Sequence, residues 1–270
     1  MEITKVFGEY LNAPFAQTLD LEYAAAAASL PKEGAGQMTM QAALEAISPM
    51  KGHMAFAKKA GLFLSALQQV LKQDAELDTA VLGEESRLDC INAFGKNYNL
   101  TVKGSAGNNA GAYMASGSLT IEGDVEDYCG MGMSGGKIVV KGLAENHLGH
   151  SMRGGEILVH RNVHDFAGNR MAGGKITVQA NAGYSLGFRM TGGCITIKDL
   201  VWDFCGEEMA GGSIEAGGHI GHETGLAMAG GELRLAEQYK DTIRPKATGG
   251  RIVPIAKARR PQAAPPQAAK

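Results

Sequence analysis

Residues 149–176 read GHSMRGGEILVHRNVHDFAGNRMAGGKI, and this stretch decides the fold. Within it the motif Met-x-Gly-Gly begins at Met152 and again, nineteen residues later, at Met171. A fixed period of this length is typical of a repeat architecture, in which each unit buries its apolar side chains against the next. The motif begins, always nineteen residues apart, at Met133, Met152, Met171, Met190, Met209 and Met228.

The repeat explains an unusual glycine content. The chain has 38 glycines among 270 residues, about twice the usual share. Glycine is needed where the backbone takes a positive φ or approaches a neighbour closely. We therefore predict structural turn glycines in every coil. In the central coils they are Gly130, Gly135, Gly136, Gly149, Gly154, Gly155, Gly168, Gly173, Gly174, Gly187, Gly192 and Gly193.

Each Gly-Gly pair is followed by an alternating, strand-like segment such as Lys175-Ile176-Thr177-Val178. The unit is too short for a strand–helix–strand crossover of about 30 residues or for a propeller blade of about 40 residues. We predict an all-β fold, a right-handed parallel β-helix over residues 77–255 with about nine coils, each with two or three short strands; the usual chirality of parallel crossovers gives the hand. Its first inward column is Leu100, Leu119, Ile138, Ile157, Ile176, Ile195, Ile214, Leu233 and Ile252, and the methionines line a further wall.

Residues 1–76 lack this period and are expected to be mostly helical. Phe56, Ala60, Phe63, Leu67 and Val70 follow helical spacing, and the intervening residues include Lys and Gln, which predicts an amphipathic helix. Shorter helices are predicted over 39–47 and 21–30. Because the end of a solenoid exposes its core and unpaired backbone, we expect these helices to cap the first coil or to dock a partner. Residues 256–270, rich in Ala, Pro and Gln, are predicted to be a disordered tail.

Composition excludes several functional classes. The 26 Lys and Arg are balanced by 28 Asp and Glu, so the chain lacks the basic field that nucleic-acid binding needs. The sequence contains no uninterrupted run of about 18 apolar residues, so no membrane span is predicted. The N-terminus does not resemble a secretory signal, so we expect a cytoplasmic protein without membrane contact. The four cysteines form no CxxC pair, so no metal site is predicted.

Two segments resemble known families. Residues 122–140, EGDVEDYCGMGMSGGKIVV, resemble the GXXGXXXG repeat of the C-terminal β-helix in large subunits of glutamate synthase. Residues 148–162, LGHSMRGGEILVHRN, together with 167–174, AGNRMAGG, resemble the β-helix subunit of formylmethanofuran dehydrogenase and of the bacterial formyltransferase/hydrolase complex. The resemblance covers about 84–255, whereas residues 1–76 match neither family.

The resemblance implies a scaffold role in a cytoplasmic complex. In both families this domain stands beside catalytic subunits or domains, so we expect a non-catalytic subunit of an oxidoreductase or of a formyl- or amide-transfer complex. The uninterrupted nineteen-residue coils and the separate short chain look more like the formylmethanofuran type. A glutamate synthase-like complex with glutaminase and flavin subunits is the alternative. No cofactor is expected on this chain. Molybdopterin and metal, or FMN and iron–sulfur groups, would belong to the other subunits.

Three outward columns are candidates for binding. Arg170 and Arg189 share a column, with Arg153 close by, and could bind an anion or an acidic partner; the alternative is a surface ladder with Glu208, next in the column. The rings of a second column could stack on a ligand or only on one another. Its residues are Tyr128, His147, Phe166 and Phe204. A third could form a cation site or the acid cluster of a polysaccharide lyase, but Asx side chains also stabilise tight turns by bonding their own backbone, which is the interpretation we favour. Its members are Asp89, Asn108, Asp127, Asn146, Asp165, Tyr184, Asp203, His222 and Asp241.

The remaining alternatives are weaker. A straight methionine ladder is typical of core packing rather than of copper binding, because soft-metal ligands must converge on one point. No nucleophile elbow, P-loop or zinc-protease motif is present, so no catalytic residue is predicted. A stand-alone carbohydrate-active β-helix enzyme would need an acidic groove and an export signal, and a self-assembling filament would need exposed end coils.

Overall fold

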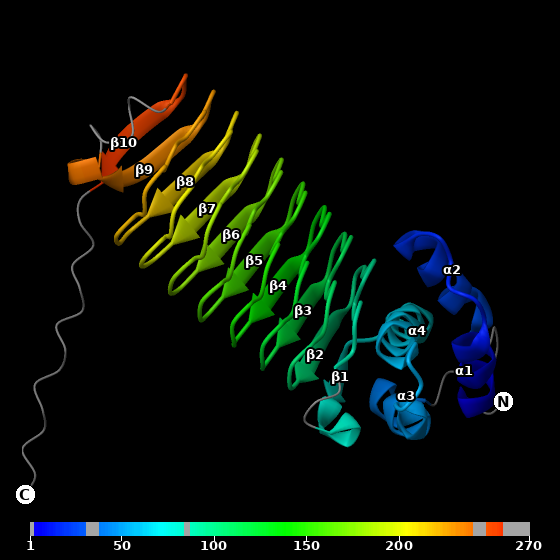
Figure 1. Ribbon diagram of the computed structural model, residues 1–270. Coiled ribbons are helices and arrows are strands. Elements are labelled where there is room, and N and C mark those ends of the chain that lie inside the picture. Colours follow the sequence, from blue (N-terminus) through cyan, green and yellow to red (C-terminus); the bar gives the residue numbers. More distant parts are fainter. Residues whose placement is uncertain (1–2, 31–37, 84–86, 240–246, 256–270) are drawn as a thin grey trace, which may run out of the picture.

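The computed structural model describes residues 3–30, 38–83, 87–239 and 247–255, and these form two regions. Helices occupy the N-terminal region, and a single all-parallel sheet of ten strands, in sequence order, follows it. Figure 1 shows the strands stacked one behind another in a rod with the helices at the β1 end. The predicted parallel β-helix with an N-terminal helical extension is therefore confirmed.

The strands follow the sequence period. From β2 to β10 each strand begins nineteen residues after the preceding one, so eight steps separate these two strands, close to the nine coils expected. The first strand lies 25 residues before β2, because a short 3₁₀ helix, Thr79–Leu82, is inserted in the first connection. The strands are β1 (Ala75–Asp78), β2 (Asn99–Lys103), β3 (Ser118–Ile121), β4 (Lys137–Val140), β5 (Glu156–Val159), β6 (Lys175–Val178), β7 (Cys194–Ile197), β8 (Ser213–Ala216), β9 (Glu232–Ala236) and β10 (Arg251–Ile255).

Strand register places equivalent residues directly above one another. Ile157 pairs with Ile138 on one side and with Ile176 on the other, and this column continues without a slip from Leu100 to Ile252. Between Leu100 and Leu233 its members are at most 1% exposed. Because strand side chains alternate between faces, a one-residue slip would turn this column out of the core.

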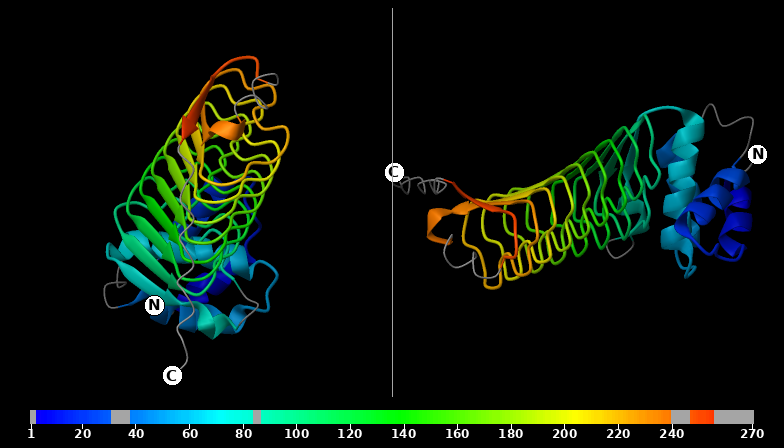
Figure 2. Two further views of the ribbon diagram at one scale, coloured as in Figure 1. Left: turned by 90° about the vertical axis from the view of Figure 1, so that its left-hand side faces the viewer. Right: turned by 90° about the horizontal axis from the view of Figure 1, so that it is seen from above.

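The rest of each coil is mostly turn rather than strand. Opposite the main sheet, a ladder of single-residue parallel bridges links coil to coil, where two or three strands per coil were expected. Figure 2 shows, from the left-hand side of Figure 1, coils of similar outline stacked on one another. Alanine and valine alternate along the ladder as far as Val201, which packs small side chains between larger ones of neighbouring coils. Its members are Ala106, Val125, Ala144, Val163, Ala182, Val201 and Ile220.

Methionine and glycine pack together at the corner before each strand. Met133 is fully buried, and a Cβ placed on Gly155, one coil later, would lie 2.7 Å from its Cε atom. Gly155 also has a φ of +85°. A Cβ on Gly155 would also meet the backbone of Gly135 and Gly136, and one on its neighbour Gly154 would meet the carbonyl oxygen of Ser134. The motif therefore combines a core side chain, a close backbone approach and a left-handed turn.

The N-terminal region consists of α1 (Ile3–Asn12), α2 (Leu19–Ser29), α3 (Met40–Ile47) and α4 (Phe56–Leu71). The last three correspond to the predicted helices, whereas α1 was not predicted. Thr39 caps α3 by accepting a hydrogen bond from the backbone of Ala42 at 3.1 Å. None of the helices in the described parts of the chain is long and apolar enough to cross a membrane.

Helix α4 lies across the first coil of the solenoid (Figures 1 and 2). The backbone nitrogen of Asp89 donates to the carbonyl of Ala57 at 3.1 Å, and the Gln68 side chain donates to the carbonyl of Asn99 at 3.0 Å. A Cβ on Gly61 would overlap the carbonyl oxygen of Asp89, so glycine permits this close packing. The helix has the position of a cap; docking of a partner by residues 1–76 stays a prediction.

The amphipathic interpretation of α4 was wrong in two respects. Phe56, Ala60, Phe63 and Leu67 are buried as the spacing predicted, but Val70 is 41% exposed. Lys59 and Gln68, which belong to the expected polar face, are fully buried. The helix is enclosed both by the first coil and by the other helices, so no solvent face remains around these two residues.

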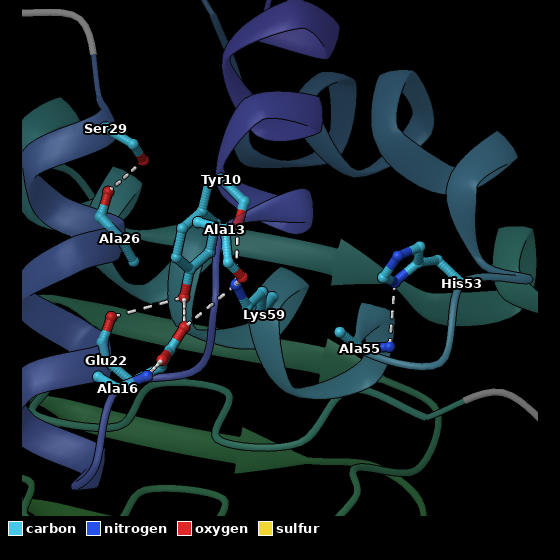
Figure 3. Close-up of polar contacts among 9 residues, drawn as sticks. All are labelled: Tyr10, Ala13, Ala16, Glu22, Ala26, Ser29, His53, Ala55 and Lys59. Carbon is cyan, nitrogen blue, oxygen red and sulfur yellow. Dashed lines mark hydrogen bonds and ion pairs between the residues drawn. The ribbon is translucent and has the colours of Figure 1, made fainter.

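Lys59 is part of a polar network that joins three helices (Figure 3). Its Nζ atom donates to the carbonyls of Tyr10 and Ala13, at 2.9 and 2.5 Å, near the C-terminal end of α1. It also lies 3.6 Å from a carboxylate oxygen of Glu22 on α2, and both side chains are 1% exposed. The Tyr10 hydroxyl donates to Glu22 at 3.0 Å. Burial, followed by the charge of Glu22, raises the pKa of the Tyr10 hydroxyl, so this proton stays in place.

The predicted disordered tail, residues 256–270, lies outside the described residues, as does Asp241 at the end of the Asx column.

Candidate interaction surface

The candidate surface is formed by the turns that face outward between the bridge ladder and the methionine corner. In one coil this stretch runs from Asn146 to Ser151. Its inward residues, Leu148 and Gly149, are buried, whereas His147 and His150 are half-buried. His147 and Ser151 have φ values of 61° and 55°, so their side chains project from left-handed backbone. The period repeats this geometry in neighbouring coils and stacks the outward side chains in columns.

The Asx column is structural in the described chain, but its bonds differ from those expected. Asp127 accepts a hydrogen bond from the backbone nitrogen of Asn146 at 3.0 Å. Asn146 accepts from Asp165 at 3.2 Å, and Asp165 accepts from Tyr184 at 2.9 Å. These side chains therefore bond the backbone of the next coil, whereas the sequence analysis expected bonds within their own turn. Each bond satisfies a backbone N–H that turn geometry leaves unpaired within its own coil.

Three of the four predicted aromatic-column residues form a continuous stack. The Tyr128 and His147 rings lie 4.6 Å apart between centroids with planes at 6°. His147 and Phe166 lie 5.1 Å apart at 14°. Phe204 is separated from them by Ser185, and in the described chain no ring contact joins it to the stack. The His147 imidazole is therefore held between two aromatic rings.

A second column, which the sequence analysis missed, flanks this stack. His150 meets Tyr128 and His147 edge-on, at centroid distances of 5.9 Å in both cases. Phe188 meets Phe166 edge-on at 6.3 Å. Asn169 is the intervening member of the column and is 8% exposed. The sequence contains the signal for this column. His150 and Asn169 lie three positions after His147 and Phe166 of the aromatic column, and Phe188 lies three positions after Ser185 of the same column. The mixed residue types of the second column concealed this period.

The predicted arginines differ in their surroundings. Arg189 pairs with Glu208, with its Nε atom 2.8 Å from a carboxylate oxygen, and lies over the Phe188 ring at 4.8 Å. Arg170 is exposed, and no described carboxylate lies within ion-pair distance of it. The Arg–Arg–Glu ladder is therefore formed only at its Arg189–Glu208 step. Arg153 is exposed beyond the inward Met152, outside these stacked columns.

These contacts define one continuous surface, the aromatic–arginine face. It consists of Tyr128, His147, Phe166, His150, Asn169, Phe188, Arg170 and Arg189.

The face contains polar atoms without partners. Three buried side-chain atoms on it have no hydrogen-bond partner among the described residues: Nδ1 of His147, Nδ1 of His150 and Oδ1 of Asn169. Burial, followed by the nearby His147 and Arg170, lowers the pKa of His150, so its imidazole is mainly neutral at pH 7. Unpaired buried polar atoms are rare in folded proteins. These three are covered in the structure, so a ligand atom reaches them only when a side chain rotates.

The cysteines do not belong to this face. Cys129 and Cys205 are buried and unpaired, and burial raises the pKa of each thiol to about 12. They are therefore protonated and poorly nucleophilic at neutral pH. In the described part of the chain, no three His, Cys, Asp or Glu side chains gather into a group that could hold a metal ion. The predictions that the chain has no catalytic residue and no cofactor stay predictions.

Comparison with known proteins bears on the repeat rather than on this face. A family model described as the GXGXG motif matches residues 89–257, which is most of the solenoid and more than half of the chain. The chain belongs to the GXGXG motif family. No curated protein matches it. The GXGXG match begins in the first coil, after the helices, so the N-terminal region is an addition to the family repeat.

Within the GXGXG repeat, the aromatic–arginine face has the chemistry of a binding surface. Its rings provide a flat apolar surface, Arg170 provides an uncompensated positive charge, and the histidines provide atoms that can donate or accept hydrogen bonds. Aromatic residues and arginine are enriched in protein interfaces for these reasons.

Proposed function

We propose that this protein is a non-catalytic β-helix subunit that organises the catalytic subunits of a cytoplasmic enzyme complex. The aromatic–arginine face is the observation that carries the proposal. It places stacked rings and an unpaired arginine on a continuous hydrogen-bonded solenoid, where little conformational entropy is lost on docking. A flexible loop carrying the same residues would lose more entropy when it docks.

The best candidate is a complex of the formylmethanofuran dehydrogenase or formyltransferase/hydrolase type. Its support is the resemblance of residues 148–162 and 167–174, together with coils that keep the nineteen-residue step from β2 to β10. In such a complex, molybdopterin and metal would be held by other subunits. This chain would contribute position and rigidity.

A glutamate synthase-like complex is the second candidate. The resemblance of residues 122–140 to the β-helix of that enzyme favours it. In that case the partners would be glutaminase and flavin subunits, with FMN and iron–sulfur groups on them.

The two candidates are distinguished by purifying the native complex through a tag on the full chain and identifying its subunits by mass spectrometry. We expect stoichiometric co-purification of a metallo-amidohydrolase or molybdopterin subunit. Amidotransferase and flavin subunits would identify the second candidate. If the chain instead elutes alone and turns over a substrate, the scaffold proposal is wrong.

Charge reversal tests which face holds the partners. Replacing Arg170 and Arg189 together by Glu is expected to remove the co-purifying subunits while the chain stays folded, because both side chains are exposed. Arg161→Glu is a matched control, since Arg161 is exposed on the turn that follows β5, outside the face. Retention of all subunits by the double variant would place the interface elsewhere.

A further inference from the structure

We propose that the aromatic–arginine face binds an acidic, aromatic-containing segment of a partner protein, with a carboxylate placed between Arg170 and the two histidines. This inference deepens the proposed function and rests on it. The chemistry of the partner follows from charge, from unpaired polar atoms and from ring geometry.

Charge selects an acidic partner. Arg189 is already neutralised by Glu208, but Arg170, in the same column one coil earlier, faces no described carboxylate at ion-pair distance. Asp127 and Asp165 border the aromatic column, but each accepts a hydrogen bond from a backbone N–H of the next coil. Glu207 and Glu208 follow the face toward the C-terminus. The positive charge is therefore concentrated at Arg170, where a carboxylate would gain a charge-assisted hydrogen bond.

The histidines add directionality. Nδ1 of His147 and Nδ1 of His150 are buried and unpaired, and their rings lie 5.9 Å apart at nearly right angles. A neutral imidazole can carry its proton on either nitrogen. Both Nδ1 atoms are covered in the free protein, so an imidazole must rotate about its Cβ–Cγ bond before a protonated Nδ1 donates to a carboxylate beside Arg170. That hydrogen bond satisfies an atom that has no partner among the described residues. After a similar side-chain rotation, Asn169 Oδ1 accepts from a backbone N–H of the bound segment.

The stacked rings select the residue beside the carboxylate. Tyr128, His147 and Phe166 form a ladder of nearly parallel planes that are half-buried. A further aromatic ring packs favourably on the edge or exposed face of such a ladder. A simple inorganic anion would leave this apolar surface unused, so a peptide segment fits the face better than a free anion.

The test uses the isolated full-length chain, labelled with ¹⁵N-histidine, and capped peptides of sequence EEFEE, KKFKK and QQFQQ. We expect EEFEE to shift the His147 and His150 resonances saturably, and the other two peptides to leave them unchanged. Arg170→Glu should weaken EEFEE binding by about tenfold or more, as loss of a charge-assisted hydrogen bond predicts. Arg170→Gln should weaken it less, and Arg161→Glu should not change it.

Three outcomes would overturn the inference. The first is an absence of saturable resonance shifts with EEFEE, and the second is equal shifts with KKFKK. The third is that acetate, at matched carboxylate concentration, reproduces the shifts and the affinity seen with EEFEE, which would reveal a simple anion site. Because this test needs no partner subunit, its result is separable from that of the purification. A complex that assembles although EEFEE fails to bind would leave the scaffold proposal intact and refute only this inference.

Discussion

Left-handed backbone residues show how one turn geometry accepts very different side chains. In the coil that starts near Asn146, positive φ values occur at His147, Gly149, Ser151 and Gly155. A Cβ at Gly149 would lie 2.6 Å from Cδ1 of Ile176, so both sterics and φ require glycine there. At His147 the side chain points outward, and the backbone cost of about 1–2 kcal/mol is opposed by ring stacking of about 0.5–1.5 kcal/mol.

Gly155→Ala is expected to destabilise the solenoid by about 2–5 kcal/mol. The range combines about 1–2 kcal/mol for a left-handed non-glycine residue with an overpacking cost of about 1–3 kcal/mol, since the new methyl group would press on Met133 and on the backbone of Gly135 and Gly136. Urea unfolding followed by circular dichroism measures it. The control is Gly52→Ala, where no atom lies within 4 Å of an added Cβ, and there we expect little change. Equal stabilities for the two variants would refute the steric explanation.

Helices α1, α2 and α4 are held together by a buried ion pair rather than by apolar packing alone. Lys59 reaches from α4 to the end of α1 and to Glu22 on α2, so it satisfies terminal carbonyls and places a positive charge at a helix C-terminus. Glu22 in turn accepts from Tyr10 and from the backbone of Ala16 at 2.5 Å. The network thus orients the helices that cover the first coil.

Lys59→Met is expected to destabilise the helical region by about 3–5 kcal/mol, because it leaves the charge of Glu22 buried and unpaired. Hydrogen exchange of the α1 and α2 amides measures the loss locally. Lys58→Met is the matched control: Lys58 is half-buried beside Phe15 and should matter by less than about 1 kcal/mol. Lys59→Met combined with Glu22→Met should recover part of the loss; unchanged exchange in the single variant would contradict this role.

Sequence reasoning succeeded where periodicity constrains position and failed where contacts join unrelated segments. Ile138, Ile157 and Ile176 could be placed in one column because a constant step leaves a single register. The bond from Lys59 to Tyr10 spans 49 residues, and nothing in the local pattern of either helix encodes it. The aromatic–arginine face was half predicted: its ring and arginine columns were named, whereas the column of His150 was missed because its mixed residue types concealed a period that the sequence does contain.

At the scale of the whole molecule, the coils act as interchangeable layers. Each one contacts its two neighbours through the same strand register and the same turn hydrogen bonds. In such an architecture stability is approximately the sum of unit and nearest-neighbour terms. One consequence is that the number of coils can change without a change in the local structure of the others.

Deletion of residues 213–231, one full nineteen-residue unit, is expected to leave a folded solenoid, because Glu232 then follows Gly212 and takes the place of Ser213 in the columns. Deletion of 213–230, one residue fewer, should greatly reduce stability in the C-terminal coils, since every later side chain is displaced by one position. Circular dichroism and urea midpoints compare the two variants. Similar midpoints would show that register does not determine stability here.

In-register stacking fixes the distances between outward groups along the axis of the solenoid. Outward groups in one column are separated along the axis by multiples of one strand spacing, about 4.8 Å. Arg170 and Arg189 are one coil apart along the axis, and Tyr128 and Phe166 are two coils apart. Adding or removing a coil between two such groups would change their separation by one strand spacing and leave the chemistry of each group unchanged.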